Sequence, residues 1–263
     1  MEMPEIVVTT TLSEQPEDER FAAEFATLLG GAFIARKDKT LQEFWVMNGV
    51  QRVVVVDHGM PICHTPGGHR LFFHPGLAKT RIRFLQQGGH DYMVEALDLR
   101  VGDRVLDANL GIANDALVIA FITRAPVIGL EKDPLIAAIT AHGLASYSWD
   151  RMPEGRVLAP LIRAVHADQR DFLQEAEAAS FDSVYFSPMF VKPKRISDDR
   201  MPLREIAPKD FVNAEVLSEA LRVARRRVVI KLNRDRPQDA ALPPGYRMIS
   251  GKKTYVEYAV YAK

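Results

Sequence analysis

Strand-like and helix-like segments alternate along most of the chain after residue 75, and this alternation constrains the fold most strongly. We expect strands at residues 104–108, 127–131, 162–166, 183–186 and 227–232. Helices are expected between them, at residues 114–123, 134–146, 169–178 and 209–224. Strands that alternate with helices are joined by right-handed crossovers and form a parallel sheet with helices on both faces. The sequence therefore predicts a Rossmann-like, doubly wound α/β fold.

The end of the chain departs from this alternation. Two strand-like segments, residues 246–249 and 254–261, are separated by only a short stretch that contains Gly251. A helix does not fit between them, so we expect a hairpin whose last strand runs antiparallel to its neighbour. The predicted sheet is thus mostly parallel, with a C-terminal antiparallel hairpin.

A smaller α/β unit is expected before this sheet. Residues 6–10, 32–35 and 52–57 are strand-like, whereas residues 16–29 and 41–47 have apolar side chains at helical spacing. Residues 58–68 are rich in proline and glycine and are expected to form a loop. We therefore predict a small N-terminal α/β domain at residues 1–68 and a larger domain at residues 69–263.

The composition excludes several classes of protein. The chain has 263 residues with 34 basic and 34 acidic side chains, so it does not wrap nucleic acid by net charge, although a local basic face is compatible with this balance. Cys63 is the single cysteine, which excludes an internal disulfide and a cysteine-rich zinc site. His69 and His74 lack metal-like spacing, so no metal is expected. The longest apolar run, residues 116–122, is too short to span a membrane, and a cytoplasmic protein is expected.

Polar residues follow the first two of these strands. Asp107, Asn109 and Gly111 come after the first strand, Asp115 opens the next helix, and Glu131 ends the second strand. Ligands of open parallel sheets bind at the carboxyl ends of the strands. Only one glycine of a dinucleotide-binding G-x-G-x-x-G is present, so a ligand without phosphate, such as S-adenosylmethionine (SAM), is favoured over a dinucleotide.

Each of these positions also has a simpler structural interpretation. Glu131 can accept hydrogen bonds from both ribose hydroxyls of a nucleoside, or it can be an exposed carboxylate paired with Lys132. Asp168, after the third strand, can reach an adenine amine, or it and Gln169 can cap the next helix. The turn at Gly111 can likewise be a plain strand-to-helix connection with Asn114 or Asp115 at the cap.

The fourth strand runs into Ser187-Pro188-Met189-Phe190. An Asp, Asn or Ser followed by proline, any residue and an aromatic residue is typical of enzymes that methylate exocyclic base amines. Such an amine is a poor nucleophile because its lone pair is delocalised into the ring, and hydrogen-bond acceptors such as the Ser187 side chain favour a pyramidal nitrogen. The ring of Phe190 would stack on the base. An ordinary proline-containing turn is the alternative.

Basic residues occur on both sides of these clusters and could contact RNA phosphates without recognising sequence. A solvated helix face is the alternative interpretation. The candidate substrate-binding residues are Lys79, Arg81, Arg83, Lys192, Lys194 and Arg195.

Residues 74–81, 105–116, 129–134 and 184–190 together resemble the bacterial small-subunit ribosomal RNA guanine-N2 methyltransferases, which are class I SAM-dependent enzymes. The resemblance covers about residues 70 to 263. It implies that SAM, whose product is S-adenosylhomocysteine, is contacted by Asn114, Asp115, Glu131, Lys132, Asp168, Gln169 and Ser187. The chain departs from the family at Ala113, where the family usually has Gly, and at Ser187, where it has Asp.

Four functional hypotheses follow. The first is methyl transfer from SAM to an exocyclic base amine of RNA, in particular guanine N2 of small-subunit ribosomal RNA, with catalysis at Ser187, Pro188 and Phe190. The second is a class I methyltransferase that acts on a small molecule or a protein. The third is a non-catalytic RNA-binding relative, suggested by Ser187 in place of Asp. A nicotinamide-dependent dehydrogenase is the fourth, and the missing glycines and the terminal hairpin disfavour it. The sequence does not predict the oligomeric state.

Overall fold

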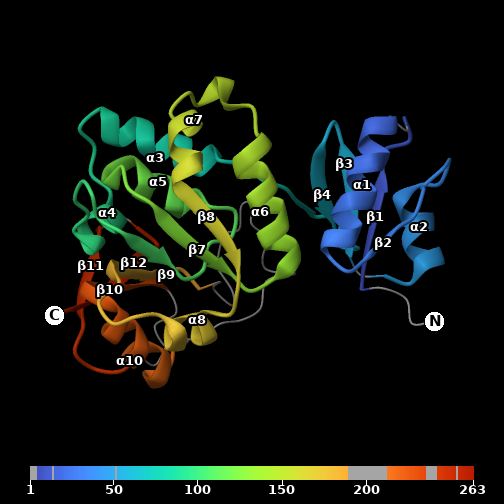
Figure 1. Cartoon of the computed structure of the whole chain (residues 1–263). Coiled ribbons are helices and arrows are strands. Elements are labelled where there is room, and N and C mark those ends of the chain that lie inside the picture. Colours follow the sequence, from blue (N-terminus) through green and yellow to red (C-terminus); the bar gives the residue numbers. More distant parts are fainter. Residues whose placement is uncertain (1–4, 14, 51, 189–211, 235–241, 253) are drawn as a thin grey trace. The chain divides into compact units, whose positions relative to one another are not determined.

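A computed structural model describes residues 5–13, 15–50, 52–188, 212–234, 242–252 and 254–263. The described chain divides into two compact units, the first ending at Phe73 and the second beginning at His74. Each unit has its own β-sheet (Figure 1). That the two units are independent domains divided near residue 68 stays a prediction.

The first unit is a five-stranded mixed sheet with two helices. Strand β1 (Ile6–Thr10) lies between β2 (Ala32–Phe33) and β3 (Arg52–Asp57) and is parallel to both. The order continues with β4 (Met60–His64) and β5 (Arg70–Leu71), each antiparallel to the strand before it. The helices are α1 (Pro16–Leu28) and α2 (Leu41–Asn48).

The prediction that residues 58–68 form a loop is wrong for residues 60–64, because β4 pairs with β3 along its whole length, whereas residues 65–68 form a turn as expected. His58 and Gly59 form the two-residue turn between these strands, and both have positive φ, at 48° and 72°. This is the backbone that tight hairpins require. The Asp18 carboxylate of α1 accepts hydrogen bonds from the backbone N–H groups of both turn residues, at 3.1 Å and 2.7 Å, which fixes the turn. Pro61 and Gly59 had suggested a loop, but they stand at the start of the strand and in its turn.

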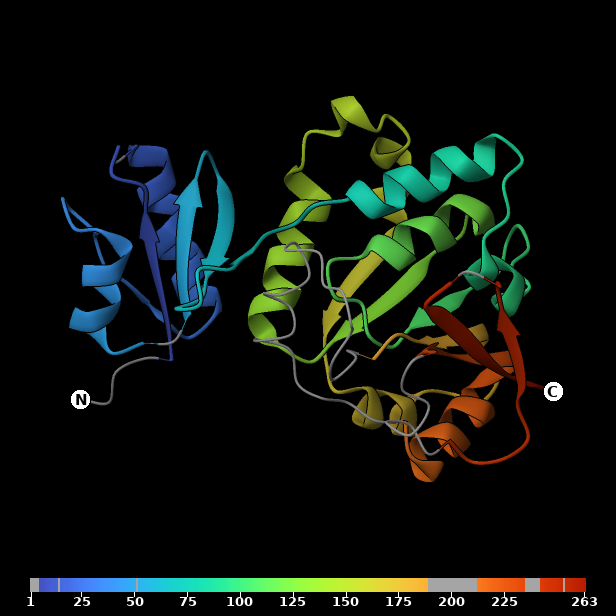
Figure 2. The ribbon, with the colours of Figure 1, turned by 180° about the vertical axis from the view of Figure 1, so that it is seen from behind.

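The two helices of the first unit cover opposite faces of its sheet. Alternate strand residues point to opposite faces, and Val7, Val53 and Val55 pack with Phe44 of α2 in one buried cluster. The intervening residues of β1 and β3 point to the other face and are buried as well. Helix α1 contacts β1, β2 and β3 and buries Ala22 and Phe25, so it covers this second face (Figures 1 and 2).

The second unit is a seven-stranded sheet in the order β11-β12-β10-β9-β6-β7-β8. Its first strands are β6 (Val105–Asp107), β7 (Val127–Glu131), β8 (Ile162–His166) and β9 (Phe181–Phe186), and the remaining ones are β10 (Ala224–Asn233), β11 (Arg247–Ser250) and β12 (Val256–Ala262). Strands β6 to β10 are parallel, and β12 is antiparallel to both β10 and β11. The predicted doubly wound, mostly parallel sheet with a C-terminal antiparallel hairpin is confirmed.

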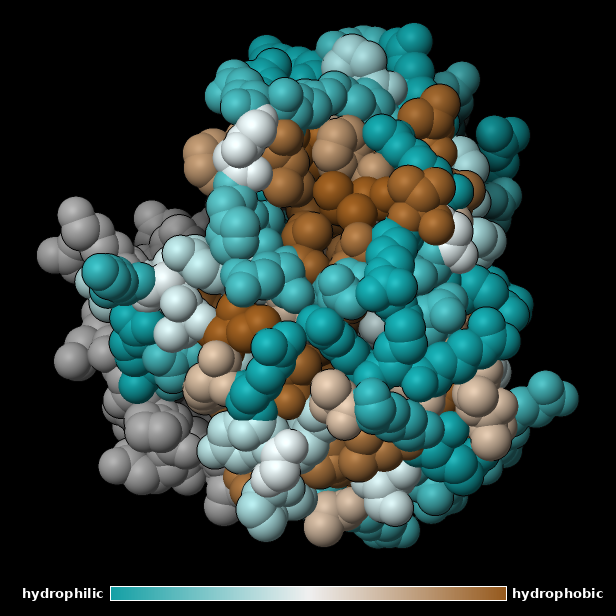
Figure 3. Space-filling view, turned by 90° about the vertical axis from the view of Figure 1, so that its left-hand side faces the viewer, coloured by the Kyte–Doolittle hydropathy of each residue, from teal (hydrophilic) through white to brown (hydrophobic). Residues whose placement is uncertain are grey.

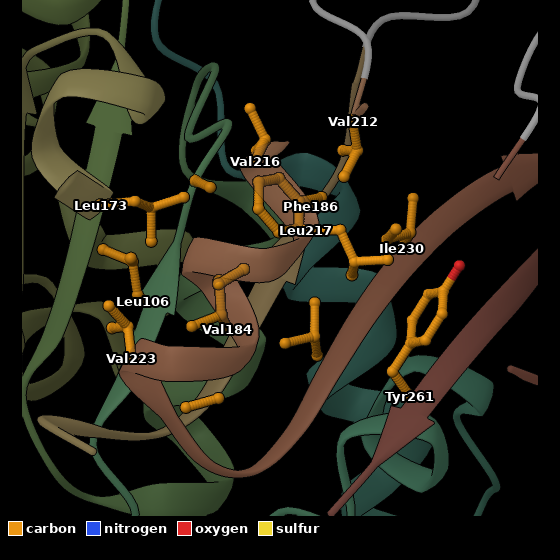
Figure 4. Close-up of a cluster of buried hydrophobic side chains, with 14 of the residues drawn as sticks. Leu106, Leu173, Val184, Phe186, Val212, Val216, Leu217, Val223, Ile230 and Tyr261 are labelled. Atoms are coloured by element: carbon orange, nitrogen blue, oxygen red, sulfur yellow. The ribbon is translucent and has the colours of Figure 1, made fainter. Parts of the chain in front are cut away.

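Helices cover both faces of this sheet. The helices before and within the crossovers are α3 (Gly76–Gln86), α4 (Tyr92–Leu97), α5 (Asn114–Thr123), α6 (Pro134–Ser146), α7 (Gly155–Leu158), α8 (Gln169–Glu175) and α10 (Ala214–Val223), with short 3-10 turns at Trp149–Arg151 and Ala159–Leu161. Leu106, Val184 and Ile230 point to one face, where α8 and α10 bury them in a continuous apolar core (Figure 4). Asp107, Tyr185 and Lys231 alternate with these residues and point to the other face, where α3 packs on α5.

The surface of the second unit is mixed in character. Figure 3 shows hydrophobic patches interrupted by hydrophilic ones on the side of this unit that carries β11. Tyr246, Met248 and Tyr255 in and near the β11–β12 hairpin are among the exposed large hydrophobic residues. Among the described residues, no helix combines the length and apolar character that crossing a membrane requires.

A glycine in the first unit offers a test of whether the two units unfold independently. A Cβ atom on Gly31 would lie 2.6 Å from the backbone oxygen of Ile6, which cannot move aside without disturbing β1. Gly31→Ala should therefore destabilise the first unit by about 1–3 kcal/mol. The two tryptophans of the chain, Trp45 and Trp149, fall one in each unit, so 5-fluorotryptophan labelling with ¹⁹F NMR follows both during urea unfolding. The Trp45 transition should shift to lower urea and the Trp149 transition should stay in place; an equal shift of both would show that the units unfold as one.

Candidate active site

The strand order reverses between β6 and β9, and the candidate site lies at this reversal. From β6 the chain proceeds outward through β7 to β8 and then returns to place β9 on the other side of β6. Crevices for ligands form where neighbouring strands of an open α/β sheet lead to opposite sides in this way. The side chain of Asn109 spans the reversal: its Oδ1 accepts a hydrogen bond from the Ser187 backbone N–H at 3.1 Å, and its Nδ2 donates to Gln169 Oε1 at 3.2 Å. Three strand ends that are far apart in sequence are therefore joined by one amide.

The turn between β6 and α5 is held against the end of β7. Gly111 has φ of 53°, and its N–H donates to Glu131 Oε2 at 3.1 Å. The other oxygen of Glu131 accepts from the Asp133 N–H at 2.9 Å, and Thr140 of α6 donates its hydroxyl to the Gly111 oxygen at 2.7 Å. Glu131 is thus 8% exposed and fixed in orientation.

Two observations at this turn fit a bound nucleoside. A Cβ atom built on Gly111 would meet no described atom within 4 Å, so the backbone of the turn faces open space next to Glu131. The Oδ2 atom of Asp107 is buried and has no hydrogen-bond partner among the described residues. Asp107, Asn109, Gly111 and Glu131 are accordingly the residues of this edge that could hold a polar cofactor.

Asp107 is fully buried, and its environment disfavours its charge. Burial, followed by the negative charge of Asp115, raises the pKa of Asp107 to about 7. Its Oδ1 accepts one hydrogen bond, from the Asn109 N–H at 3.2 Å. The carboxyl group is therefore divided between its protonated and ionised forms near neutral pH.

Lys132 and Asp168 contact each other. Their side chains form an ion pair of 2.8 Å, and Asp168 also caps α8 by accepting from the Arg170 N–H at 2.8 Å. The ammonium of Lys132 and the backbone hydrogen bond hold the pKa of Asp168 below its usual value, although partial burial opposes them. The capping role that the sequence left open for Asp168 is therefore observed. Gln169 is buried and faces Asn109 instead of solvent.

Asn114 and Asp115 connect α5 to α3. Asn114 Oδ1 accepts from the Ala78 N–H at 2.9 Å, and its Nδ2 donates to the His74 oxygen at 3.3 Å. Asp115 accepts from Arg81 at 2.5 Å, from Lys231 at 2.9 Å and from the Tyr185 hydroxyl at 2.9 Å. These two residues therefore hold helix α3 against the sheet beside the site.

Arg81 is engaged in ion pairs of the same network. It donates two hydrogen bonds to Asp91, at 2.7 Å and 3.0 Å, in addition to the one to Asp115. A phosphate contact at Arg81 would require these ion pairs to break, whereas Lys79 and Arg83 on the same helix are partly exposed and exposed. The other expected site residues, Phe190, Lys192, Lys194 and Arg195, lie outside the described residues.

Tyr185 and Lys231 complete the environment of Asp115, although no motif in the sequence points to them. Lys231 stands in an otherwise apolar strand, Val228 to Leu232, and it shares a sheet face with Asp107 and Tyr185. A lysine at a core-facing strand position signals a buried acidic partner, because an unpaired buried charge is strongly destabilising. The partners Arg81 and Lys231 lower the pKa of Asp115 despite its burial.

The sheet order, with one antiparallel strand, β12, inserted next to β10, defines the class I SAM-dependent methyltransferase fold. Comparison with known proteins agrees. The crystal structure of a SAM-dependent methyltransferase from Neisseria gonorrhoeae superposes with a TM-score of 0.65 at 17% identity, over 97% of this chain and 95% of that one.

The family follows from sequence. Residues 70–263 match the family described as "Putative SAM-dependent methyltransferase". The chain is 30% identical to "Ribosomal RNA small subunit methyltransferase J" of Ectopseudomonas mendocina, over 92% of this chain and 89% of the relative, and 27% identical to "Uncharacterized protein YpiP" of Bacillus subtilis, over 97% and 98%. The protein belongs to this family of SAM-dependent methyltransferases and is an enzyme of that class.

The raised pKa of Asp107 predicts a pH dependence of stability. The unfolded chain releases this proton near pH 4 and the folded chain near pH 7, so the group's contribution to stability is complete below pH 4 and is lost as the pH rises to 7. Asp107→Asn abolishes this loss. Relative to the wild type, the variant should therefore gain about 2–3 kcal/mol of unfolding free energy between pH 5 and pH 8. Guanidinium unfolding of both proteins at the two pH values measures this, and a pH-independent difference would contradict the prediction.

The ion pairs of Arg81 predict a structural role for this residue. Arg81→Met leaves Asp91 and Asp115 without a shared cation and should cost about 3 kcal/mol of unfolding free energy. The matched control is Arg83→Met on the same helix, where the side chain is exposed and the cost should stay within about 0.5 kcal/mol. Equal losses in both variants, measured by urea unfolding, would show that the network does not stabilise the fold.

Proposed function

We propose that this methyltransferase transfers the methyl group of SAM to an exocyclic base amine in small-subunit ribosomal RNA. The observation that carries the proposal is the hydrogen bond between Asn109 and the Ser187 backbone N–H, because it fixes the expected catalytic segment beside the opening at the β6 turn. The relatives named ribosomal RNA small subunit methyltransferase J support the RNA substrate. The resemblance of the motifs supports guanine N2 as the acceptor atom and the cytoplasm as the compartment.

The cofactor would be held by the ends of β6 and β7. The Glu131 carboxylate, fixed beside the turn, would accept hydrogen bonds from the ribose hydroxyls, and Gly111 leaves the approach open. Asp107 and Asn109 offer acceptors for the polar amino-acid portion, and the Lys132–Asp168 pair with Gln169 would border the adenine. Bound SAM supplies a methyl group activated by its sulfonium. Asn114 and Asp115 would act indirectly, by holding α3 and α5 in place.

The catalytic segment would act by orienting the amine. The Ser187 side chain makes no hydrogen bond to a described residue, so its hydroxyl oxygen can accept a hydrogen bond from an amine N–H. Accepting this hydrogen bond would localise the lone pair on the amine nitrogen. The rest of the rate acceleration would come from holding the amine close to the methyl group. A hydroxyl is a weaker acceptor than the Asp found here in the family, so more of the effect would fall on backbone carbonyls next to Pro188.

The test is a methyl-transfer assay with isotopically labelled SAM and two acceptors, unmodified small-subunit ribosomal RNA and subunits assembled from it. Mass spectrometry of nuclease digests should find one methylated base with the methyl group on an exocyclic nitrogen. Transfer to neither acceptor, in a preparation that binds S-adenosylhomocysteine by calorimetry, would contradict the proposed substrate. That result would favour a small-molecule or protein acceptor or the non-catalytic alternative.

Asn109 offers a sharper test of the site. Asn109→Ala removes the acceptor of the Ser187 N–H and the partner of Gln169, so the catalytic segment loses its fixed position. We expect kcat to fall by about tenfold to a hundredfold, which corresponds to about 1–3 kcal/mol. Gln174→Ala, at an exposed position of α8, is the control and should leave kcat unchanged. Wild-type kcat in Asn109→Ala would contradict the assigned role.

A further inference from the structure

A histidine and two arginines lie together on one face of the first unit. His64 of β4 and Arg70 of β5 are directly opposed in the antiparallel register, so their side chains point to the same face. His64 is also paired with Val53 of β3, which belongs to the apolar cluster under α2. Val53, His64 and Arg70 therefore all point to the α2 face. The guanidinium of Arg70 lies 5.8 Å from the ring centre of Phe72, which is 38% exposed.

Arg36 belongs to the same cluster. Burial, then the positive charges of Arg70 and Arg36, lowers the pKa of His64 to about 4, so both guanidinium groups act on this imidazole. Arg36 donates from Nε to the Lys39 oxygen at 2.7 Å, and neither Arg36 nor Arg70 forms an ion pair with a described residue. We call Arg36, Arg70 and Phe72 the Arg36–Arg70 patch. Its two fixed charges have no acidic partner in the part of the chain that the structure describes.

The charges of the first unit are divided between its two faces. Of the ten acidic residues up to residue 73, seven precede residue 25, and four of these lie on α1. Five of its six basic residues follow residue 35. On the α2 side the acidic residues are Asp38, Glu43 and, by alternation with Val53 and Val55, Asp57 at the far end of β3. Glu43 is engaged by the backbone and hydroxyl of Thr40 in a capping box. Helix α1 is therefore predominantly acidic, whereas the Arg36–Arg70 patch on the other face is basic.

We propose that the Arg36–Arg70 patch binds the phosphodiester backbone of the RNA substrate. Guanidinium groups suit phosphate because their planar donors match its oxygens, and two unpaired ones close together form a local positive site on a chain of zero net charge. Phe72 adds an aromatic surface on which an unpaired base can stack. The inference rests on the proposed function and assigns the first unit the task of holding RNA, apart from the chemistry at β6 and β9.

Loss of Arg36 and Arg70 should weaken RNA binding and make it less dependent on salt. Each phosphate contact releases condensed counterions, so loss of two contacts should lower the magnitude of the slope of log affinity against log salt by about 1.5–2. The RNA affinity should fall roughly tenfold or more at moderate salt. Methyl transfer at saturating RNA should keep its kcat, because neither arginine belongs to the site at the strand ends of the second unit.

The experiment compares three full-length proteins: wild type, Arg36→Gln/Arg70→Gln, and Arg20→Gln. Arg20 is exposed on α1, the opposite face, and loses the same kind of charge. Fluorescence anisotropy with labelled, unmodified small-subunit ribosomal RNA gives affinity at several salt concentrations, and calorimetry gives the affinity for S-adenosylhomocysteine. The double variant should bind RNA more weakly with a shallower salt slope and a raised KM, while kcat and S-adenosylhomocysteine affinity stay unchanged.

The outcomes separate this inference from the proposed function. If wild type methylates RNA and the double variant keeps its affinity and salt slope, or if Arg20→Gln loses as much affinity, the patch is not an RNA contact. If wild type neither binds nor methylates RNA, the proposed substrate and this inference both fail. If the double variant unfolds, the single variant Arg70→Gln tests the inference instead, because Arg70 is exposed on the edge strand. This variant should lower the salt slope by about half as much as the double variant.

Discussion

The reversal of strand order between β6 and β9, bridged by the side chain of Asn109, is the constraint on which the rest of the site depends. The reversal opens an edge of the sheet where helices diverge, and such an edge needs polar contacts to close it. Asn109 supplies them by binding the Ser187 backbone and Gln169 at once. The β6–α5 turn, Ser187 and the start of α8 thereby keep fixed positions relative to one another.

A second layer of polar contacts lies beneath this edge. Asp115 carries a full negative charge in the interior because Arg81, Lys231 and Tyr185 all donate to it, and these partners come from α3, β10 and β9. Burial of unpaired charges is costly, so the network holds only when all its members are in place. Its negative charge also helps to keep Asp107 partly protonated, which links helix α3 to the electrostatics at the end of β6.

Sequence patterns predicted the sheet and the shared edge because both follow from general rules. Alternating strands and helices define a parallel sheet, and the carboxyl ends of its strands must meet, so Asn109, Glu131 and Ser187 could be placed together from the sequence. The partners of individual charged side chains could not be predicted from the sequence. The pairing of Lys132 with Asp168, or of Arg81 with Asp91 and Asp115, depends on how helices pack. Strand β4 was missed because Gly59 and Pro61 suggest a loop, whereas here they serve a tight turn and a strand start.

The central claim is that the ends of β6, β7 and β9 form one SAM pocket that faces Ser187. A crystal structure of the protein with S-adenosylhomocysteine tests it most directly. The account predicts that the ribose hydroxyls lie within hydrogen-bond distance of the Glu131 carboxylate and that the sulfur faces the Ser187 segment. Density for the ligand elsewhere, or a ribose that Glu131 does not contact, would contradict it.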